Sequence, residues 1–426
     1  MTSFWAEAAE PQWTASPLRE PLRCEVAVVG GGFTGLASAY HLARAGVDVG
    51  LFEARELVSG ASGQNGGQVL LGWPRDLTSL AHEWGDLVAE ALWTLSRRAV
   101  ARVAQLIDEE DIRCQWRQTG HVDAATTSQE VDALQAEREW LIQHGHQTAV
   151  WWSADAMRQR LGTPYYRGGL FDEQAWAFHP RQYGWGLALA ARRHGARLFS
   201  HTPIIRVVQH PGPTYELVTG SGFSIQAKHV LWATNGYLPP GAHWLRGRIV
   251  PVYSAQIAVQ LAEPSALPLD LPTVSDTSPE YHYFSRVGPD LVIFGGRLET
   301  HARRQGDFSP LEDQWRQLFP TVGSVRVTHR WAGRIALSQD FMPHIVQWAP
   351  GCWFAGGYTG HGAALSTEFG AIMATLATGG HVPGEVETLL KLPWRPLRFR
   401  RHWRPGARAT IGDGRHAPLV RATIRV

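Results

Sequence analysis

The segment Cys24-Glu-Val-Ala-Val-Val-Gly-Gly-Gly-Phe-Thr-Gly-Leu36 decides the fold of this 426-residue chain. Its apolar run up to Val29 is typical of a strand that is buried on both faces of a parallel sheet. Glycines end that strand, residues 36–45 have a helical pattern that stops at Gly46, and residues 47–53 form a second apolar strand. The order of strand, glycine turn, helix and strand predicts a βαβ unit.

The glycine turn reads Gly30-x-Gly32-x-x-Gly35, and Glu53 follows at the end of the second strand. In this context Gly30 permits the tight turn, Gly32 lets a pyrophosphate approach the backbone, and Gly35 allows close packing of helix on sheet. Glu53 can accept hydrogen bonds from ribose hydroxyls, and the helix N-terminus meets phosphate charge. The motif therefore predicts a dinucleotide site, the alternative being a tight turn without a ligand.

Three further segments favour FAD over NAD. Residues 60–68 (GASGQNGGQ) offer small residues and backbone donors, and residues 231–236 (LWATNG) end an apolar strand with small residues. Residues 356–362 (GGYTGHG) open the last predicted helix, whose N-terminus would stabilise the negative charge of a reduced flavin. Each segment alone is compatible with an ordinary glycine loop, but their order favours FAD. No second G-x-G-x-x-G follows a strand, so we expect no separate NAD(P)H domain.

The predicted cofactor contacts come from the glycine turn, the second strand, the three segments above and one position of a later strand. They are Gly30, Gly32, Phe33, Thr34, Gly35, Glu53, Ala54, Arg55, Gly60, Ala61, Ser62, Asn65, Gly66, Gly67, Gln68, Val207, Ala233, Thr234, Asn235, Gly357, Tyr358, Thr359, Gly360, His361 and Gly362.

The composition is that of a globular protein, with 44% hydrophobic and 18% charged residues. No apolar run is long enough to span a bilayer, and residues 1–23 do not resemble a secretory signal, so we expect a cytoplasmic protein. The cysteines Cys24, Cys114 and Cys352 lie far apart without a C-x-x-C pair, which argues against disulfide scaffolds, zinc ribbons and dithiol oxidoreductases. We expect no metal site and no nucleic-acid partner.

The chain has β/α elements at both ends and a middle that is rich in β-formers, which predicts a discontinuous cofactor domain with an inserted substrate domain. The expected cofactor domain comprises residues 1–110, 150–240 and 325–390, and the expected substrate domain comprises 111–149 and 241–324. Residues 391–426 form a basic extension with Lys391 and nine arginines against Asp413. We expect a packed terminal element followed by a mobile tail there, rather than a lipid or nucleic-acid site.

Four segments resemble the superfamily of D-amino-acid oxidase, glycine oxidase and sarcosine oxidase, and within it the gamma-glutamylputrescine oxidases. They are Val26–Leu36, Gly60–Gln68, His329-Arg-Trp-Ala-Gly333 and Gly357–Gly362. The resemblance covers about residues 3–390. It implies a fold of the α/β and α+β classes, with a glutathione-reductase-like FAD-binding Rossmann domain and an antiparallel-sheet substrate domain over the flavin. It also implies hydride transfer from an amine-bearing carbon to flavin N5, after which water hydrolyses the imine.

The resemblance also bears on how the flavin is held and reoxidised. Some relatives attach it through a cysteine shortly before the equivalent of Asp340 or through a histidine within residues 60–68; neither occurs here, so we expect noncovalent FAD. The sarcosine-oxidase branch places a lysine over the flavin to assist the reaction with oxygen, whereas this chain has Leu291-Val-Ile-Phe-Gly-Gly296 on that strand. Two electron acceptors stay open. One is O2, with Arg297 or His361 supplying a positive charge, and the other is an electron carrier; we favour the oxidase.

Candidate substrate residues are His179, Trp331, Arg334, Tyr283, Arg297 and His361. His179, in a segment that resembles one near the flavin, can orient or deprotonate an amine, or can be a satisfied structural histidine. Trp331 and Arg334 lie on the strand that leads to the flavin ring, where we expect them to line the pocket. Tyr283 and Arg297 belong to the predicted substrate sheet, where they would wall the pocket and hold a carboxylate, unless they only pack or face solvent.

We therefore predict a FAD-dependent oxidoreductase that oxidises the C–N bond of a small-molecule amine such as gamma-glutamylputrescine. An amino-acid oxidase or dehydrogenase of the same fold, passing electrons to a carrier, is the nearest alternative. A noncatalytic flavin-binding subunit is an alternative of another class. The sequence does not determine the oligomeric state.

Overall fold

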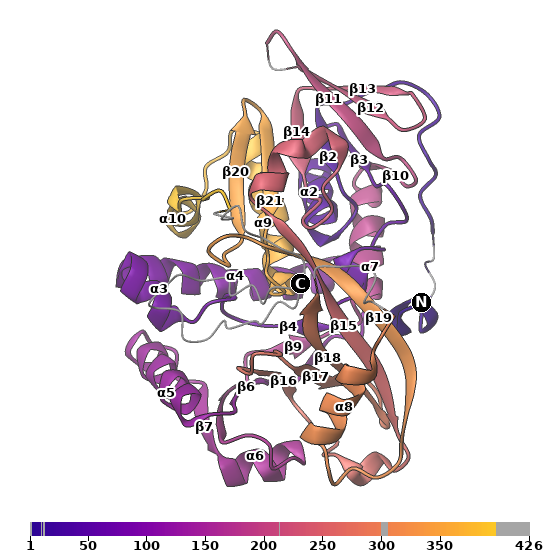
Figure 1. Cartoon of the computed structure of the whole chain (residues 1–426). Helices are drawn as coiled ribbons and strands as arrows, with labels where there is room; N and C mark the ends of the chain where they lie inside the picture. Colours follow the sequence, from indigo (N-terminus) through magenta and orange to yellow (C-terminus); the bar gives the residue numbers. More distant parts are fainter. Residues whose placement is uncertain (1, 10, 12, 213, 300–305, 398–426) are drawn as a thin grey trace, which may run out of the picture.

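The computed structural model describes the chain except residues 1, 10, 12, 213, 300–305 and 398–426. Figure 1 shows two regions, one built on a six-stranded sheet and the other on an eight-stranded sheet, with helices between them. The chain passes between the two regions several times, so both are discontinuous in sequence. The N-terminal helix α1 (Phe4–Glu7) lies beside this junction and places Trp5 in the core.

The six-stranded sheet is the core of the first region. Its first five strands are parallel, and the edge strand β20 runs antiparallel to β21. In spatial order the strands are β10 (Arg197–Phe199), β3 (Val49–Phe52), β2 (Val26–Val29), β14 (His229–Trp232), β21 (Cys352–Gly356) and β20 (His344–Ala349). Helices α2 (Phe33–Arg44) and α9 (Gly362–Ala377) pack on this sheet and on each other.

The βαβ unit forms where the sequence predicts it. All four residues of β2 are buried, and α2 begins directly at Phe33, three residues before the predicted start. Gly35 lies in the first turn of α2, and a Cβ there would come within 1.9 Å of the Gly30 carbonyl oxygen. A Cβ on Gly370 of α9 would likewise come within 2.5 Å of the Thr34 oxygen. Glycines therefore let α2 approach both the turn and α9.

The eight-stranded sheet is mixed, with one parallel pair, β16 and β6, among antiparallel ones. In spatial order the strands are β19 (Val325–Leu337), β15 (Val250–Leu261), β18 (Leu291–Glu299), β17 (Tyr283–Arg286), β16 (Thr273–Asp276), β6 (His121–Ala125), β8 (Gly168–Asp172) and β7 (Ala149–Ser153). The strands β7, β8 and β19 therefore belong to this sheet, although the sequence-based boundaries at 150 and 325 placed residues 150–172 and 325–337 in the cofactor domain. Hydropathy shows that a segment is a strand, but it does not show with which strand it pairs.

Helices connect and cover the sheets. Residues 77–109 form two helices, because Gly85, with φ +90°, separates them. The helices are α3 (Leu77–Trp84), α4 (Asp86–Glu109), α5 (Ser128–Gln143), α6 (Ala154–Leu161), α7 (Pro180–Arg193), α8 (Ser309–Leu318) and α10 (Gly384–Lys391). Of the predicted basic extension, residues 391–397 are described and 398–426 lie outside the described residues.

Two small sheets complete the fold, one with the order β1-β13-β12-β11 and the other β4-β9-β5. Their strands are β1 (Leu22–Arg23), β13 (Ser224–Ala227), β12 (Thr214–Thr219), β11 (Ile204–His210), β4 (Gln68–Val69), β9 (Trp176–Ala177) and β5 (Arg117–Gln118). Short 3-10 helices are η1 (Ala61–Gly63), η2 (Pro240–Gly247) and η3 (Pro264–Ala266).

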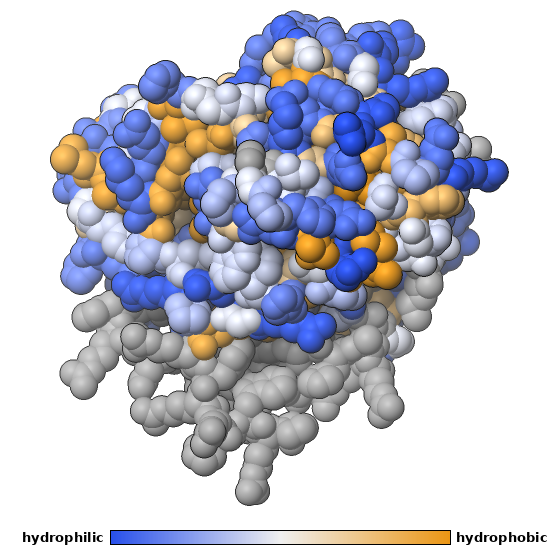
Figure 2. All heavy atoms as spheres, turned by 90° about the horizontal axis from the view of Figure 1, so that it is seen from above, coloured by the Kyte–Doolittle hydropathy of each residue, from blue (hydrophilic) through white to orange (hydrophobic). Residues whose placement is uncertain are grey.

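Figure 2 shows one face of the molecule, on which the described residues are mainly hydrophilic, with hydrophobic areas between them. Within the described ranges, no helix combines the length and apolar character needed to cross a bilayer. The same residues contain no group of three or more His, Cys, Asp or Glu side chains arranged for a metal ion.

Candidate functional site

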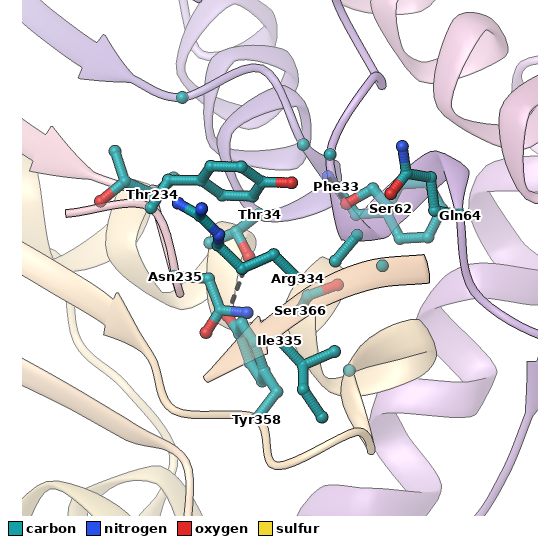
Figure 3. Close-up of a pocket in the computed structure, with 18 of the residues that line it drawn as sticks. Phe33, Thr34, Ser62, Gln64, Thr234, Asn235, Arg334, Ile335, Tyr358 and Ser366 are labelled. Atoms are coloured by element: carbon teal, nitrogen blue, oxygen red, sulfur yellow. Dashed lines mark hydrogen bonds between the residues drawn. The ribbon is translucent and has the colours of Figure 1, made fainter. Parts of the chain in front are cut away.

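A cavity of about 490 Å³ runs between the two regions, and we call it the cofactor cavity. Its volume lies in the range of small-molecule sites. Figure 3 shows that side chains from α2, η1, the end of β14, β19 and α9 surround it. The predicted cofactor residues that line it are Gly30, Gly32, Phe33, Thr34, Glu53, Ala54, Arg55, Gly60, Ala61, Ser62, Asn65, Gly66, Gln68, Ala233, Thr234, Asn235, Tyr358, Thr359, Gly360, His361 and Gly362.

The glycine turn forms one end of this cavity. Gly30 has φ +112°, and a Cβ there would come within 2.7 Å of the Ala233 carbonyl oxygen, so only glycine fits. The Glu53 carboxylate accepts hydrogen bonds from the backbone N–H groups of Gly31 (2.7 Å) and Arg55 (2.8 Å). The turn, the α2 N-terminus and a carboxylate at the end of β3 thus have the arrangement that binds a dinucleotide's pyrophosphate and ribose.

The loop of residues 60–68 forms the next part of the wall and is held by its own side chains. Asn65 donates to the Ser62 carbonyl oxygen (2.9 Å) and accepts from the Gly67 N–H (2.8 Å). The Ser62 hydroxyl accepts from the N–H of Phe33 at 3.0 Å, which ties the loop to the start of α2. The Trp331 indole donates to the Gln64 carbonyl oxygen at 3.1 Å. The loop is therefore fixed in shape before any ligand binds.

The opposite wall carries polar atoms without partners. The Thr234 and Ser366 hydroxyls are buried, line the cofactor cavity and have no hydrogen-bond partner among the described residues. The Thr34 and Tyr358 hydroxyls lie 2.8 Å apart in the same wall. A buried hydroxyl without a partner is destabilising unless a bound molecule or water satisfies it. The turn, the carboxylate and these hydroxyls together fit FAD.

Two arginines and two tyrosines form an alternating stack beside this cavity. The Arg55 guanidinium lies 5.1 Å from the Tyr237 ring centroid, and Arg334 lies 5.1 Å from the same ring and 5.0 Å from that of Tyr253. Arg334 also donates to the Tyr253 hydroxyl at 2.9 Å. The stack brings two positive charges to the cofactor cavity, where they favour an anionic cofactor.

A second cavity of about 210 Å³ adjoins the first, and we call it the acidic chamber. The two cavities share Leu70, Tyr281, Thr359 and His361 in their linings. The chamber lies between α3, α4, α5 and the strands β6, β8 and β16. Its carboxylates are Asp76, Asp123, Glu137, Asp172 and Asp276.

His361 stands where the two cavities meet, directly before α9. Its Nε2 lies 3.0 Å from the Leu71 carbonyl oxygen. Because a carbonyl only accepts, Nε2 carries the hydrogen and Nδ1 keeps a lone pair. Burial lowers the pKa of His361, although the hydrogen bond to Leu71 and the negative charge of Asp123 act in the opposite direction. The imidazole is therefore a neutral group that can accept a proton from a bound molecule.

Tyr283 and Tyr281 line the cofactor cavity from β17 and the turn before it. The Tyr283 hydroxyl lies 3.0 Å from the Ser254 hydroxyl, and its ring packs where a Cβ on Gly66 or Gly295 would touch it. Burial raises the pKa of both tyrosines, so both remain neutral hydrogen-bonding groups. Tyr283 thus lines the cofactor cavity, and its role as a wall of the substrate pocket stays a prediction.

Several predicted site residues do not line either cavity. His179 and Trp331 are each 2% exposed: His179 caps α7 through Nδ1, and Trp331 holds the 60–68 loop. Arg297 belongs to β18, but its side chain lies outside the described residues. The remaining predicted cofactor residues do not line the cofactor cavity; these are Gly35, Gly67, Val207 and Gly357. For Val207, the neighbours Ile204 and Ile205 line the cavity instead.

Sequence reasoning missed residues that the fold brings to the cavities. In the cofactor cavity they include Gln64, Tyr237, Ser254, Gln256 and Ser366. Ser254 and Gln256 are two apart on β15 and both buried, so polar residues on one face of an apolar strand were the available signal. His121 and Asp123 on β6 form the same pattern at the acidic chamber.

Comparison with known proteins adds three findings about sequence. The family described as FAD dependent oxidoreductase (DAO) matches residues 25–376. Gamma-glutamylputrescine oxidoreductase of Escherichia coli is 29% identical over 384 residues, which cover 89% of each chain. The probable oxidoreductase OrdL of Haemophilus influenzae is 28% identical over 400 residues, covering 92% of this chain and 91% of the relative.

Solved structures share the fold. Glycine oxidase from Geobacillus kaustophilus superposes with a TM-score of 0.69 at 22% identity, covering 85% of this chain and 96% of that one. L-proline dehydrogenase from P. horikoshii has a TM-score of 0.71 at 19% identity, covering 86% and 96%. The predicted fold class is confirmed, and so is the resemblance to this group of flavoproteins.

Proposed function

Because this chain belongs to the DAO family of FAD-dependent oxidoreductases, we propose that it oxidises the C–N bond of a small-molecule amine. Gamma-glutamylputrescine or a related amine is the proposed substrate, which rests on the similarity to gamma-glutamylputrescine oxidoreductase along nearly the whole chain. Bound FAD supplies an acceptor that takes two electrons as a hydride at N5 of its ring. The oxidised product is an imine, which water then hydrolyses.

One observation carries this proposal: the cofactor cavity opens into a second cavity at His361. An amine in the second cavity lies beside whatever part of the cofactor reaches the α9 N-terminus. His361 offers the Nδ1 lone pair to the amine proton, so the amine nitrogen is neutral when its carbon loses hydride. Tyr281 and Tyr283 supply neutral hydroxyls to the cofactor cavity.

Noncovalent attachment of the cofactor is part of the proposal. Among the described residues, none of Cys24, Cys114 and Cys352 lines the cofactor cavity, and all three are buried elsewhere. The 60–68 loop contains no cysteine or histidine. Flavin should therefore separate from the polypeptide on acid denaturation, and flavin absorbance that stays with the precipitated protein contradicts this.

We favour O2 as the acceptor, with an electron carrier as the alternative. The positive charge of Arg334 lines the cofactor cavity and can stabilise the anionic forms of reduced oxygen. Hydrogen peroxide produced in step with substrate consumption supports the oxidase. Substrate turnover with an artificial dye and no peroxide supports a dehydrogenase.

Anaerobic mixing of the FAD-loaded protein with a panel of amines and amino acids tests the function. Loss of the oxidised-flavin absorbance with gamma-glutamylputrescine or a simple amine is the expected result. Bleaching by amino acids alone would shift the assignment to amino-acid oxidation. Bleaching by none of them would favour a noncatalytic flavin-binding subunit.

A further inference from the structure

The acidic chamber has an excess of negative charge. Five carboxylates line it, and Arg75 is the one arginine or lysine in the described part of its lining. That guanidinium is already paired with Glu83 at 2.7 Å and stacks on Trp84. The chamber therefore has uncompensated negative charge, which attracts cations and disfavours anions.

Three of the five carboxylates are engaged by the protein. Asp172 binds His146, Thr148 and the Gln174 N–H; Asp276 binds His282 and Ser278; Asp76 caps α3 through Ser79 and also binds Thr78. His146 contacts Asp172 through Nε2, and His282 contacts Asp276 through Nδ1. The other contacts come from hydroxyl and backbone N–H groups. Their oxygens are largely satisfied, so they contribute charge more than binding capacity.

Asp123 and Glu137 each have one carboxyl oxygen without a partner among the described residues. Asp123 Oδ1 is 3.3 Å from His121 Nε2 and 3.1 Å from the Ser275 hydroxyl, and Oδ2 has no partner within the described chain. Glu137 Oε1 accepts from the Leu77 N–H at 3.1 Å, and its Oε2 likewise has no described partner. The Asp123 side chain is 51% exposed although its strand lies inside the sheet, so its free surface faces the chamber.

The Asp123 and Glu137 side chains lie in different parts of the chamber. Asp123 interacts electrostatically with His361, which marks the cofactor end. Glu137 belongs to α5 and lies beside Asp76 at the start of α3. Burial would raise the pKa of Asp123, but His121 and Ser275 outweigh it and lower the pKa, so this carboxylate is ionised at neutral pH.

The rest of the lining suits an alkyl chain with polar ends. Leucines and tryptophans cover the surface between the carboxylates; these are Leu71, Trp73, Leu134, Leu141 and Leu170. Trp93 also lines the chamber and is 6% exposed, and its indole N–H has no hydrogen-bond partner among the described residues. This donor needs an acceptor such as a water oxygen, which an ammonium group does not provide, so Trp93 contributes apolar surface to the site of the alkyl chain.

We propose that the acidic chamber binds a second ammonium group of the substrate, with Asp123 as the residue that selects it. The preferred amines are then α,ω-diammonium chains, whose second charge lies several methylenes from the carbon that is oxidised. A chain whose distal end has a carboxylate and no ammonium is disfavoured by the same charges. This inference rests on the proposed function, because it assigns to the chamber the part of the amine that does not react.

Three probes of equal chain length separate the charge effect from everything else: 1,4-diaminobutane, 1-aminobutane and 4-aminobutanoate. Anaerobic flavin reduction is followed against the concentration of each probe. We expect half-saturation by the diamine at a concentration at least about tenfold below that of the monoamine, and by the amino acid at the highest concentration. Equal half-saturation for diamine and monoamine, or a preference for the amino acid, overturns the inference.

Asp123→Asn should reduce the ratio between the half-saturating concentrations of 1-aminobutane and the diamine to about threefold or less, because the ratio compares the two probes within the same variant. Asp132→Asn is the matched control, since Asp132 is exposed on α5 and has no described partner. Flavin content and melting temperature show whether either variant is folded. An undiminished diamine preference in folded Asp123→Asn contradicts the proposal.

If none of the three probes reduces the flavin, the proposed function is wrong for these amines. The inference about the chamber is then tested by binding alone. Each probe is titrated into the oxidised enzyme, and the perturbation of the flavin spectrum is recorded. Tighter binding of the diamine that is lost in Asp123→Asn still supports the chamber's role. Equal titrations for the three probes reject it.

Discussion

The cofactor cavity and the acidic chamber meet at His361 but are built differently. The cofactor cavity takes its shape from backbone: the left-handed Gly30, the N-terminus of α2 and the fixed loop of residues 60–68. The chamber takes its character from side chains on separate elements, such as Asp123 on β6 and Glu137 on α5.

This difference separates two tasks. A wall made of backbone changes little when side chains are replaced, so the cofactor and its two-electron chemistry stay constant. A wall made of side chains can exchange a carboxylate for a neutral group without altering the sheet beneath it. Cofactor binding should therefore be sensitive to added volume at a few glycines, and substrate choice should be sensitive to charge in the chamber.

The most damaging test of the backbone wall is Gly32→Val. Gly32 has φ −86° and ψ −174°, which valine adopts without strain, and the added Cβ would come within 2.8 Å of the Ser62 hydroxyl, so that flexible side chain must rotate away. The side chain would instead occupy space that a pyrophosphate needs. We expect FAD affinity to fall at least about 100-fold, roughly 2.7 kcal/mol, with little loss of folding. Flavin release and the melting temperature of the flavin-free protein measure the two effects.

Gly323→Val is the matched control, because a Cβ at Gly323 would meet nothing within 4 Å. It should keep its flavin. If Gly32→Val retains flavin as the wild type does, the cofactor's phosphates do not approach this turn, and the cofactor cavity has been assigned wrongly.

At the junction, His361→Gln should slow flavin reduction by about 100-fold without loss of flavin. The glutamine amide can still donate to the Leu71 carbonyl oxygen, but it lacks the basic lone pair that Nδ1 provides. Stopped-flow bleaching at saturating amine gives the rate. His210→Gln, at an exposed position of β11, is the control. A rate within about threefold of wild type would remove His361 from proton transfer.

The same contrast explains what the sequence could predict. The glycine turn, Glu53, residues 60–68 and the start of α9 were found because each is a local pattern whose function follows from backbone geometry. In each case, the residues adjacent in the sequence are enough to identify the pattern. The eight-stranded sheet was only partly assigned, because alternation identifies β7, β8 and β19 as strands and does not say which sheet they join.

The chamber could not be predicted in the same way. Asp123 becomes a chamber residue only because β6 pairs with β16. This pairing brings Ser275, which lies 152 positions further along the chain, to Asp123. His179 was open to a role at the amine or a structural role, and its ring caps α7, so a role at the amine stays a prediction. Side-chain roles that depend on long-range pairing therefore require the three-dimensional structure.

The smallest expected effect concerns the energetic cost of the chamber's charge. Burial raises the pKa of Glu137 to about 8, and Asp76 and Asp123 add to this, while the Leu77 N–H opposes it. An unfolded glutamic acid titrates near 4.5. Folding thus favours the protonated form, and the stability that this contributes is complete below about pH 4.5 and lost as pH rises towards 8. Glutamine, which does not ionise, avoids that loss.

Glu137→Gln should therefore stabilise the flavin-loaded protein at about pH 9 relative to about pH 5. Water in the chamber screens the charges, so we expect about 1–2 kcal/mol, or a rise in melting temperature of about 1–3 °C at the higher pH. Glu139→Gln, on the exposed face of the same helix, should track the wild type at both pH values. If Glu137→Gln differs from wild type by the same amount at both, the Glu137 carboxyl is not destabilised by its neighbours. A pH-dependent difference shows instead that ionising Glu137 is unfavourable, because the side chain is buried and lies near the Asp76 and Asp123 carboxylates.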